Sequence, residues 1–197
     1  MSLEIELKAR IEKPDELKAR LSELGNFCYS YQKNDTYWSF PRRSDFKLRV
    51  RQQTATDEKG ESKDSTLITF KTKGIRDGVE VNNERELTVS DGKVFEEILS
   101  HMGLVPFVKK EKRGMAWECG KGEGVPQILA ELSDVKHLGW FLELEIQSEN
   151  VDERDIENNR QRLLDLLGKL DIPASKIEAR PYTELLTKCP ILPGYSR

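Results

Sequence analysis

The sequence predicts an α+β fold in which eight antiparallel strands close into a β-barrel with helices packed outside it. The chain opens with Glu4-Ile5-Glu6-Leu7-Lys8, where charged and apolar residues alternate with the period of two of a β-strand. The same alternation returns in at least four later stretches, with charges of both signs. One such strand alone is most simply half-exposed, with its charges in water. A closed barrel with charged faces inward and apolar faces outward satisfies all of them together.

The expected strands follow this alternation along the chain. They are residues 4–10, 27–40, 46–51, 65–73, 79–89, 104–117, 128–135 and 140–147. Between the third and fourth, residues 54–64 are polar, contain Gly60 and are predicted to form a long exposed hairpin loop.

Helices are predicted where apolar residues recur every three or four positions. Residues 14–25 carry such a stripe, with Pro14 suited to the first turn and Gly25 to the position after the last. Residues 91–103 carry a second stripe that is interpreted as core packing (Phe95, Ile98, Leu99 and Met102). A long helix is expected over about 152–170, and short helices within 173–179 and 182–188.

The composition indicates one domain over residues 1–197, with barrel and helices to about 188 and an exposed tail at 189–197. The net charge of -3 gives no overall attraction to nucleic acid or anionic membrane, so any anion site must be a local cluster. Three separated cysteines indicate reduced thiols in a cytoplasmic protein. No apolar run approaches the ~18 residues of a membrane span.

Charges inside a barrel need partners, because burying them alone is very costly. The expected inward cations are Lys8, Arg49, Arg51, Lys71 and Lys73, with some of Lys110, Lys112 and Arg113. The expected inward carboxylates are Glu4, Glu6, Glu84, Glu86, Glu143 and Glu145, joined by Asp134. Internal salt bridges would satisfy both sets. A triphosphate does so better, since Lys and Arg suit its oxygens and paired carboxylates suit Mg²⁺ or Mn²⁺ bridging to it.

The opening Glu4-x-Glu6-x-Lys8 resembles the CYTH family, also called triphosphate tunnel metalloenzymes. The likeness extends in order over almost the whole chain, through Asp35-Thr36-Tyr37, Leu48-Arg49-Val50-Arg51, Phe70-Lys71-Thr72-Lys73, Glu84-Arg85-Glu86, the basic cluster, Asp134 to Glu145 and Pro181-Tyr182. It is greatest for the branch that resembles class IV adenylyl cyclases. Two departures are Asn82-Asn83, where an Arg is common, and Pro181 in place of Ser.

The resemblance implies a tunnel that binds a triphosphate with divalent metal. By position, Lys8, Arg49, Arg51, Lys71, Lys73, Lys110 and Arg113 would hold phosphate. The metal side would be formed by Glu4, Glu6, Asp134, Glu143 and Glu145. Glu6, Glu143 and Lys8 are the catalytic candidates, and Asp35, Tyr37, Glu84 and Glu86 further tunnel-lining residues.

Three functions follow from these residues. The leading one, which the resemblance implies, is a metal-dependent enzyme that converts ATP to cyclic AMP and pyrophosphate. The second is a triphosphatase acting on tripolyphosphate, thiamine triphosphate or a nucleotide. The third is a non-catalytic polyphosphate- or nucleotide-binding module. The partner expected in each case is a small triphosphate, with neither nucleic acid nor membrane, and a homodimer is left open.

Overall fold

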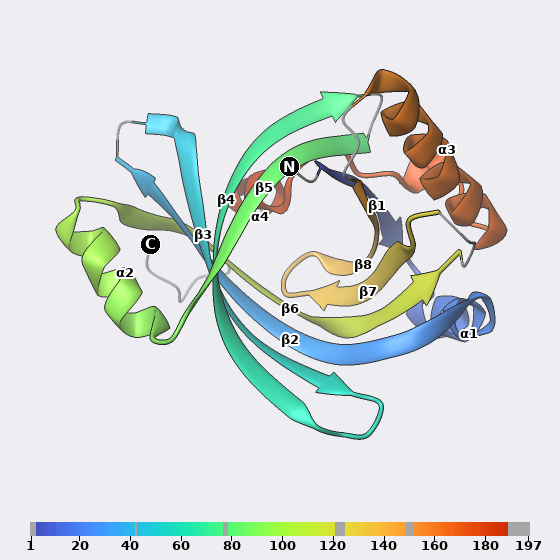
Figure 1. Cartoon of the computed structure of the whole chain (residues 1–197), viewed down its shortest axis with the longest axis horizontal. Helices are drawn as coiled ribbons and strands as arrows, with labels where there is room; N and C mark the ends of the chain where they lie inside the picture. Colours follow the sequence, from blue (N-terminus) through green and yellow to red (C-terminus); the bar gives the residue numbers. More distant parts are fainter. Residues whose placement is uncertain (1–2, 42, 77–78, 121–124, 149–151, 189–197) are drawn as a thin grey trace.

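The computed structural model describes residues 3–41, 43–76, 79–120, 125–148 and 152–188, and only the backbone at 43–46, 71–76, 79–81, 83 and 84. Its strands are β1 Leu3–Ile11, β2 Gly25–Phe40, β3 Arg43–Asp57, β4 Ser62–Arg76, β5 Val79–Val89, β6 Val105–Cys119, β7 Ile128–Val135 and β8 Gly139–Ser148. They pair antiparallel in the order β1-β5-β4-β3-β2-β6-β7-β8, and β8 pairs with β1 (Figure 1). The predicted closed barrel is confirmed.

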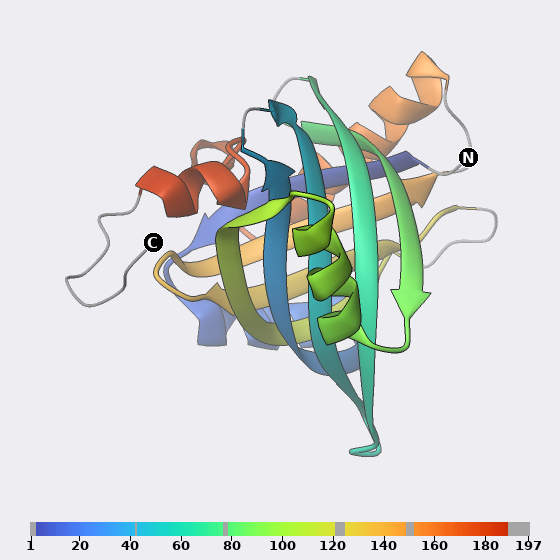
Figure 2. The ribbon, with the colours of Figure 1, turned by 90° about the vertical axis from the view of Figure 1, so that its left-hand side faces the viewer.

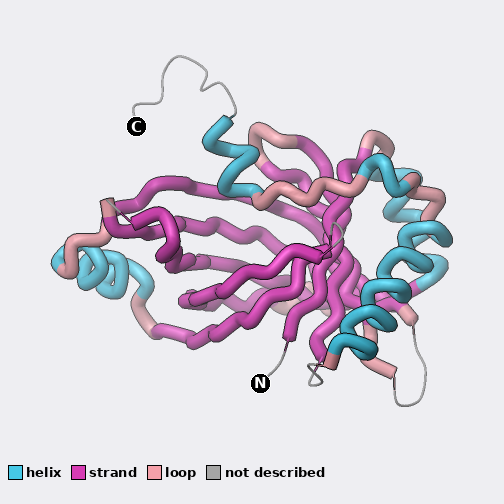
Figure 3. Tube along the Cα trace, turned by 90° about the horizontal axis from the view of Figure 1, so that it is seen from above, coloured by secondary structure: helices cyan, strands magenta, loops and turns pink. Residues whose placement is uncertain are grey.

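The helices pack around this barrel. They are α1 Pro14–Leu24, α2 Gly92–His101, α3 Glu153–Lys169, the single 3₁₀ turn η1 Ala174–Lys176, and α4 Tyr182–Lys188. Figure 3 shows α2 on one side of the strands and α1 with α3 on the other. Asp91 and Asp152 begin α2 and α3, because each side chain accepts backbone N–H bonds of the first turn. No helix in the described part of the chain is both long and apolar enough to span a membrane.

The main core lies between the outer face of the barrel and the helices α1 and α3. Ile5, Leu7 and Ala9 of β1 are completely buried there, packed with the apolar face of β8 and with leucines of both helices. Their charged neighbours in sequence therefore point to the opposite, inner face of the strands. The alternation in the sequence thus decides which side chains face the interior.

A second, smaller core lies beneath α2. Trp38, Val50 and Ile68 pack there with Leu99, and Phe95 is partly buried against them. The rest of the predicted α2 stripe is wrong as core packing, because Ile98 is 48% and Met102 63% exposed. A ten-residue helix lying on one curved sheet buries only the strip that faces the sheet, and these two residues lie beside that strip.

The hairpin between β3 and β4 is longer than the sequence predicts. Strand pairing continues to Thr56 and Ser62, so most of the expected loop at 54–64 is β-structure. Thr54 donates to the Asp64 carboxylate at 2.6 Å, and the Thr56 and Ser62 hydroxyls are 2.8 Å apart. Such cross-strand pairs stabilise a sheet even where it is exposed. Figure 2 shows the hairpin extending below the rest of the barrel.

Candidate active site in the barrel interior

The barrel encloses a cavity of about 1010 Å³, lined by side chains from all eight strands and by residues 181–183. Among the described residues, its lining includes seven cations: Lys8, Lys33, Lys47, Arg49, Arg51, Lys110 and Lys112. It also includes six carboxylates: Glu4, Glu6, Glu86, Glu131, Glu143 and Glu145. The two sets lie largely apart. We call the six cations of β2, β3 and β6 the cation wall, and the five carboxylates of β1, β7 and β8 the carboxylate wall.

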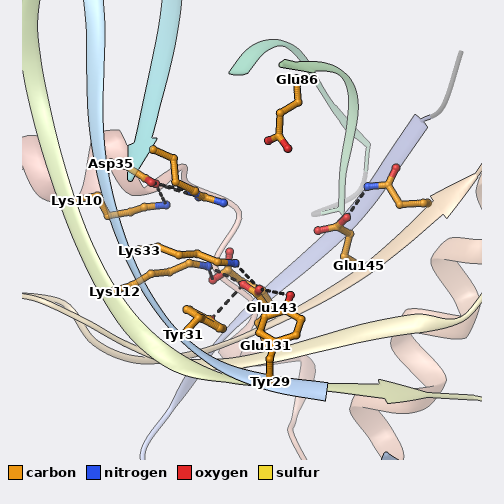
Figure 4. Close-up of polar contacts among 12 residues, drawn as sticks. Tyr29, Tyr31, Lys33, Asp35, Glu86, Lys110, Lys112, Glu131, Glu143 and Glu145 are labelled. Carbon is orange, nitrogen blue, oxygen red and sulfur yellow. Dashed lines mark hydrogen bonds and ion pairs between the residues drawn. The ribbon is translucent and has the colours of Figure 1, made fainter. Parts of the chain in front are cut away.

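The cation wall is built on a buried carboxylate, Asp35, whose side chain is 0% exposed. Arg51 binds it with two parallel bonds, Nε to Oδ1 at 2.7 Å and Nη2 to Oδ2 at 3.0 Å. The Lys110 ammonium lies 3.0 Å from Oδ2 (Figure 4). Burial would raise the pKa of Asp35, but Arg51 and Lys110 hold it well below its usual range. Because one negative charge faces two fixed cations, this part of the wall keeps a net positive charge.

Arg49 continues the cation wall towards β4 and β5. Its Nη2 donates to Thr69 Oγ1 at 2.8 Å and lies 3.8 Å from the Glu86 carboxylate. Thr69 in turn donates to Glu86 at 3.2 Å. Glu86 is the only carboxylate among the described cavity-lining residues that lies outside the carboxylate wall. The contact holds the Arg49 guanidinium at the cavity surface.

The two walls meet at Glu131. Its carboxylate accepts bonds from Lys33 and from Lys112, the latter at 2.9 Å, and from the Tyr31 hydroxyl at 3.1 Å (Figure 4). Burial would raise the pKa of Glu131, but the two lysines hold it well below its usual range. Burial would lower the pKa of Lys112, but Glu131 and Glu143 hold it well above its usual value. Burial lowers the pKa of Lys33 to about 8. Glu131 and Lys112 therefore stay ionised at neutral pH, and the pKa of Lys33 lies closer to neutral pH than that of either.

Glu143 connects the walls to the C-terminal segment. It accepts from Lys112 at 2.8 Å and from the Tyr182 hydroxyl at 3.0 Å. Two ammonium groups lie close to the Tyr182 ring, with Lys8 Nζ at 4.6 Å and Lys110 Nζ at 4.7 Å from its centroid. Burial and the Glu143 charge raise the pKa of Tyr182 well above its usual value, so it stays a neutral donor.

The carboxylates of β1 and β8 suit a divalent cation in type and in register. Glu6 lies directly opposite Glu145 on the neighbouring strand, and Lys8 opposite Glu143. Opposite residues on one face of an antiparallel pair have Cβ atoms about 5 Å apart. No three His, Cys, Asp or Glu side chains form a ready metal cage within the described part of the chain. Mg²⁺ is commonly held by one or two carboxylates together with substrate phosphates and water, which the Glu6–Glu145 pair fits.

Most of the predicted site residues line this cavity. They are Glu4, Glu6, Lys8, Tyr37, Arg49, Arg51, Glu86, Lys110, Glu143 and Glu145. Asp35 lies beneath Arg51 and Lys110. The side chains of Lys71, Lys73 and Glu84 lie outside the described residues, although their backbones belong to β4 and β5. The roles of all these residues stay predictions.

Two predicted residues do not line the cavity. Arg113 is 78% exposed and pairs with Asp134 at 3.4 Å. They are opposite neighbours on β6 and β7, on the face that carries the buried Leu132. Both residues therefore lie on the outer face of the barrel, and the prediction that they hold phosphate and metal in the interior is wrong. The register of β6 places Lys110 and Lys112 inward, because they pair with Asp35 and Lys33 of β2.

The sequence analysis missed several polar cavity residues, among them Tyr29, Tyr31, Lys33 and Glu131. The first three share the alternating face of Asp35 and Tyr37, so the period of two could have found them. Glu131 lies directly opposite Glu143. Its inward position follows from Ile128, Ala130 and Leu132, which form the apolar face of β7. That pattern also places Asp134 outside.

The family comparison decides how this barrel is classified. The model of the CYTH domain matches residues 2–182. The chain belongs to the CYTH family. A protein of Methanocaldococcus jannaschii named a putative adenylate cyclase is 27% identical over 190 residues, covering 93% of this chain and 98% of the relative.

Solved structures of CYTH-like folds resemble the chain as a whole. The PH1819 protein of Pyrococcus horikoshii is 25% identical with a TM-score of 0.77, over 94% of this chain and 98% of that one. A Hippeastrum protein, named a putative adenylyl cyclase and described as having a dominant triphosphatase activity, is 16% identical with a TM-score of 0.64 over 98% of both chains. At that identity the likeness concerns the fold.

Proposed function

We propose that this CYTH protein is a divalent-metal-dependent enzyme that binds a triphosphate in the barrel cavity. The leading reaction is conversion of ATP to cyclic AMP and pyrophosphate, in line with the name of the M. jannaschii relative. The observation that carries the proposal is a cation wall facing a carboxylate wall across one enclosed cavity. A sheet face exposed to solvent would not require this cavity, and neither would charged side chains that only pair with one another.

The cation wall would bind and orient the phosphate chain. Arg51 and Lys110 are fixed on Asp35, so their order is established before ligand arrives, and Arg49 extends the positive surface. Preorganised donors of this kind stabilise charge that develops on a leaving phosphate, because they need little rearrangement during the reaction. Lys112 and Lys33 would approach the phosphate chain from the Glu131 side.

The carboxylate wall would supply the metal side and a proton acceptor. Glu6 and Glu145, with Glu4, would hold Mg²⁺ or Mn²⁺, which when bound neutralises phosphate charge. In cyclisation the ribose 3′-oxygen bonds to the α-phosphorus, the bond from that phosphorus to the bridging oxygen breaks, and pyrophosphate leaves with the electron pair. Glu143, positioned by Lys112 and Tyr182, is the proposed acceptor of the hydroxyl proton.

The reaction type is tested by product analysis. The purified protein is incubated with ATP, tripolyphosphate or thiamine triphosphate, each with Mg²⁺, with Mn²⁺ or with EDTA. Cyclic AMP and pyrophosphate from ATP, lost with EDTA, are expected. Orthophosphate from any of the three substrates would assign hydrolysis instead. If all three ligands bind without turnover under every metal condition, the protein is a binding module and the enzymatic proposal is wrong.

A further inference from the structure

The outer face of the barrel carries exposed apolar side chains around α2. Five large ones on β4, β5 and α2 are between 40% and 63% exposed: Phe70, Leu87, Val94, Ile98 and Met102. Single exposed hydrophobic residues are normal on a protein surface, whereas a contiguous group of them marks an interaction site. The strand register and the direction of α2 show that these five adjoin.

On the sheet, Phe70 and Leu87 are diagonal neighbours. Ile68 of β4 lies directly opposite Leu87 of β5, and Phe70 is the next residue of β4 on the same face. Ile68 itself is buried beneath α2 together with Leu99. Diagonal side chains on one face of a sheet lie about 7–8 Å apart, within reach of an aromatic ring. Phe70 and Leu87 therefore border the part of the sheet that α2 covers.

On α2, Val94, Ile98 and Met102 recur every four residues and form one stripe. The stripe lies beside Phe95 and Leu99, which pack on the sheet. In Figure 2, α2 rises in front of β3 and β4, with β5 to its right. A right-handed helix in this direction that places Phe95 and Leu99 on the sheet turns the stripe towards β5. The stripe and the two strand residues thus form one surface, which we call the α2 patch.

The α2 patch has the size of half a dimer interface. Each of its five side chains exposes about half of a surface of roughly 150–200 Å², so the patch measures about 450 Å². Two such patches face to face would remove about 900 Å² of apolar surface from water. Since interfaces are about 60% apolar, this corresponds to roughly 1,500 Å² in total, the size of a stable protein–protein contact.

The charges beside the α2 patch have both signs. Arg85 of β5 and Lys93 of α2 are exposed cations, and Glu96 and Glu97 of α2 are carboxylates. A nucleic acid or an anionic membrane would meet these carboxylates as well as the cations and would gain little. A second copy of the chain fits better. When the same patch is used twice around a two-fold axis, cations of one copy can approach carboxylates of the other.

We propose that the α2 patch is the interface of a two-fold symmetric homodimer of this chain. Ile98, in the middle of the stripe, is buried there together with Phe70 and Leu87. These two strand residues alternate with Thr69 and Glu86, which line the cavity from the other face of β4 and β5. The second copy therefore supports the strands that form this side of the cavity. The inference does not depend on the proposed function, because no cavity ligand takes part in the contact.

The test measures the mass of the protein in solution by sedimentation velocity. A dimer is expected at about 10 µM, because interfaces of this size bind in the micromolar range or tighter. Ile98→Lys places a charge in the apolar centre, twice in a two-fold dimer, and the dissociation constant should rise at least about hundredfold. The matched control is Leu24→Lys, which adds the same charge to a leucine of α1 that is 42% exposed and should leave the dimer intact.

Three results would overturn the proposal within this series. One is a dimer that persists in both Ile98→Lys and Met102→Lys, since it must then use another surface. Another is equal dissociation in Leu24→Lys, which would assign the effect to added charge and not to the α2 patch. The third is a monomeric wild type. Met102→Lys replaces Ile98→Lys if the latter does not fold, as seen by circular dichroism.

A monomeric wild type would also leave the α2 patch to another occupant, which two measurements identify. If a chain ending at residue 188 dimerises, residues 189–197 cover the patch in the full chain. If the full chain sediments with phosphatidylcholine vesicles and Ile98→Lys does not, a lipid surface covers it. Both results contradict the homodimer.

Discussion

The two walls of the cavity are stabilised differently. The cation wall contains its own buried anchor, Asp35, which fixes Arg51 and Lys110 from the same sheet region. On the carboxylate wall, Glu131 and Glu143 both bind Lys112, and Glu131 also binds Lys33, so their ammonium partners come from the cation wall where the two walls meet. Under the proposed function, the phosphate-binding surface is therefore ordered by its own buried anchor, whereas Glu131 and Glu143 are held by lysines of the other wall. Changes on the two walls should therefore have separable effects.

The largest effect is expected on the carboxylate wall. Glu143→Gln keeps the shape and the hydrogen bond from Tyr182 but removes the proposed proton acceptor. We expect kcat to fall by about 10²–10⁴-fold, the usual contribution of a general base, with the Kd for ATP changed only a few-fold. Rapid-quench turnover and calorimetric titration measure the two quantities. The control is Glu111→Gln, an exposed residue that pairs with Lys136. Intact turnover in Glu143→Gln would remove the catalytic role assigned to this residue.

The next effect belongs to the cation wall. Arg49→Gln removes one charged donor, and we expect the Kd for ATP to rise about 10- to 100-fold, as for one lost charged hydrogen bond. The matched control is Arg113→Gln, which removes the same charge from the outer face and should leave Kd unchanged. If Arg113→Gln weakened ATP binding as much as Arg49→Gln, the conclusion that the ligand binds to the inner face of the barrel would be wrong.

A pH dependence distinguishes Lys33 from its neighbours at the junction of the walls. Burial lowers its pKa from 10.5 to about 8, so the ammonium is present at pH 7 and is lost as pH rises through 8. Loss of one positive charge weakens binding of a polyanion, and kcat/KM for ATP should fall by roughly threefold to tenfold between pH 7 and pH 9. Lys33→Met should lack this step. Persistence of the step in Lys33→Met would assign it to another group.

The smallest effect is expected at Glu178, in the C-terminal segment that also contains Tyr182, and it concerns the free energy of unfolding. Glu178, almost buried, binds Arg180 and Arg10 with bonds of 2.6–3.1 Å, and Lys8 Nζ donates to the Arg180 carbonyl. The bond from Arg180, opposed by some burial and supported by Arg10, lowers the pKa of Glu178 to about 2. Both arginines are about half exposed, so Glu178→Gln should cost only about 1–2 kcal/mol in unfolding free energy at pH 7.

This stabilisation has a defined pH window. A carboxylate with a lowered folded-state pKa contributes fully above its unfolded value of 4.5, and the contribution disappears as pH falls towards 2. Urea midpoints of wild type and Glu178→Gln should therefore differ at pH 7 and converge near pH 2–3. Glu184→Gln, which breaks the exposed pair with Lys188, is the control and should not shift the midpoint. A constant difference at all pH values would point to packing and not to the charge.

The sequence correctly predicted the inward residues of a strand wherever its charged residues occupy only one of the two alternating faces. Lys8, Arg49 and Glu143 are such residues, because their neighbours on both sides are apolar and must lie under helices. The prediction failed where that condition was missing. Within residues 109–113, positive charges fall on both alternating faces of the strand. Only the pairing with β2 places Lys112 inward and Arg113 outward. Asp134 was predicted to join the inward carboxylates, although the alternation of β7 places it outside.

The period of each strand, the helical stripes and the order of elements were fixed by local sequence, because backbone geometry alone sets which neighbours share a face. Tertiary structure decided which strands meet. β2 pairs with β6 although residues 41–104 separate the two strands, and this pairing brings Lys33 and Lys112 to the same carboxylate, Glu131. No local pattern contains that choice, since it depends on ring closure and on the stagger between strands. The partners of each charge, and so the separate character of the two walls, arise only when the barrel closes.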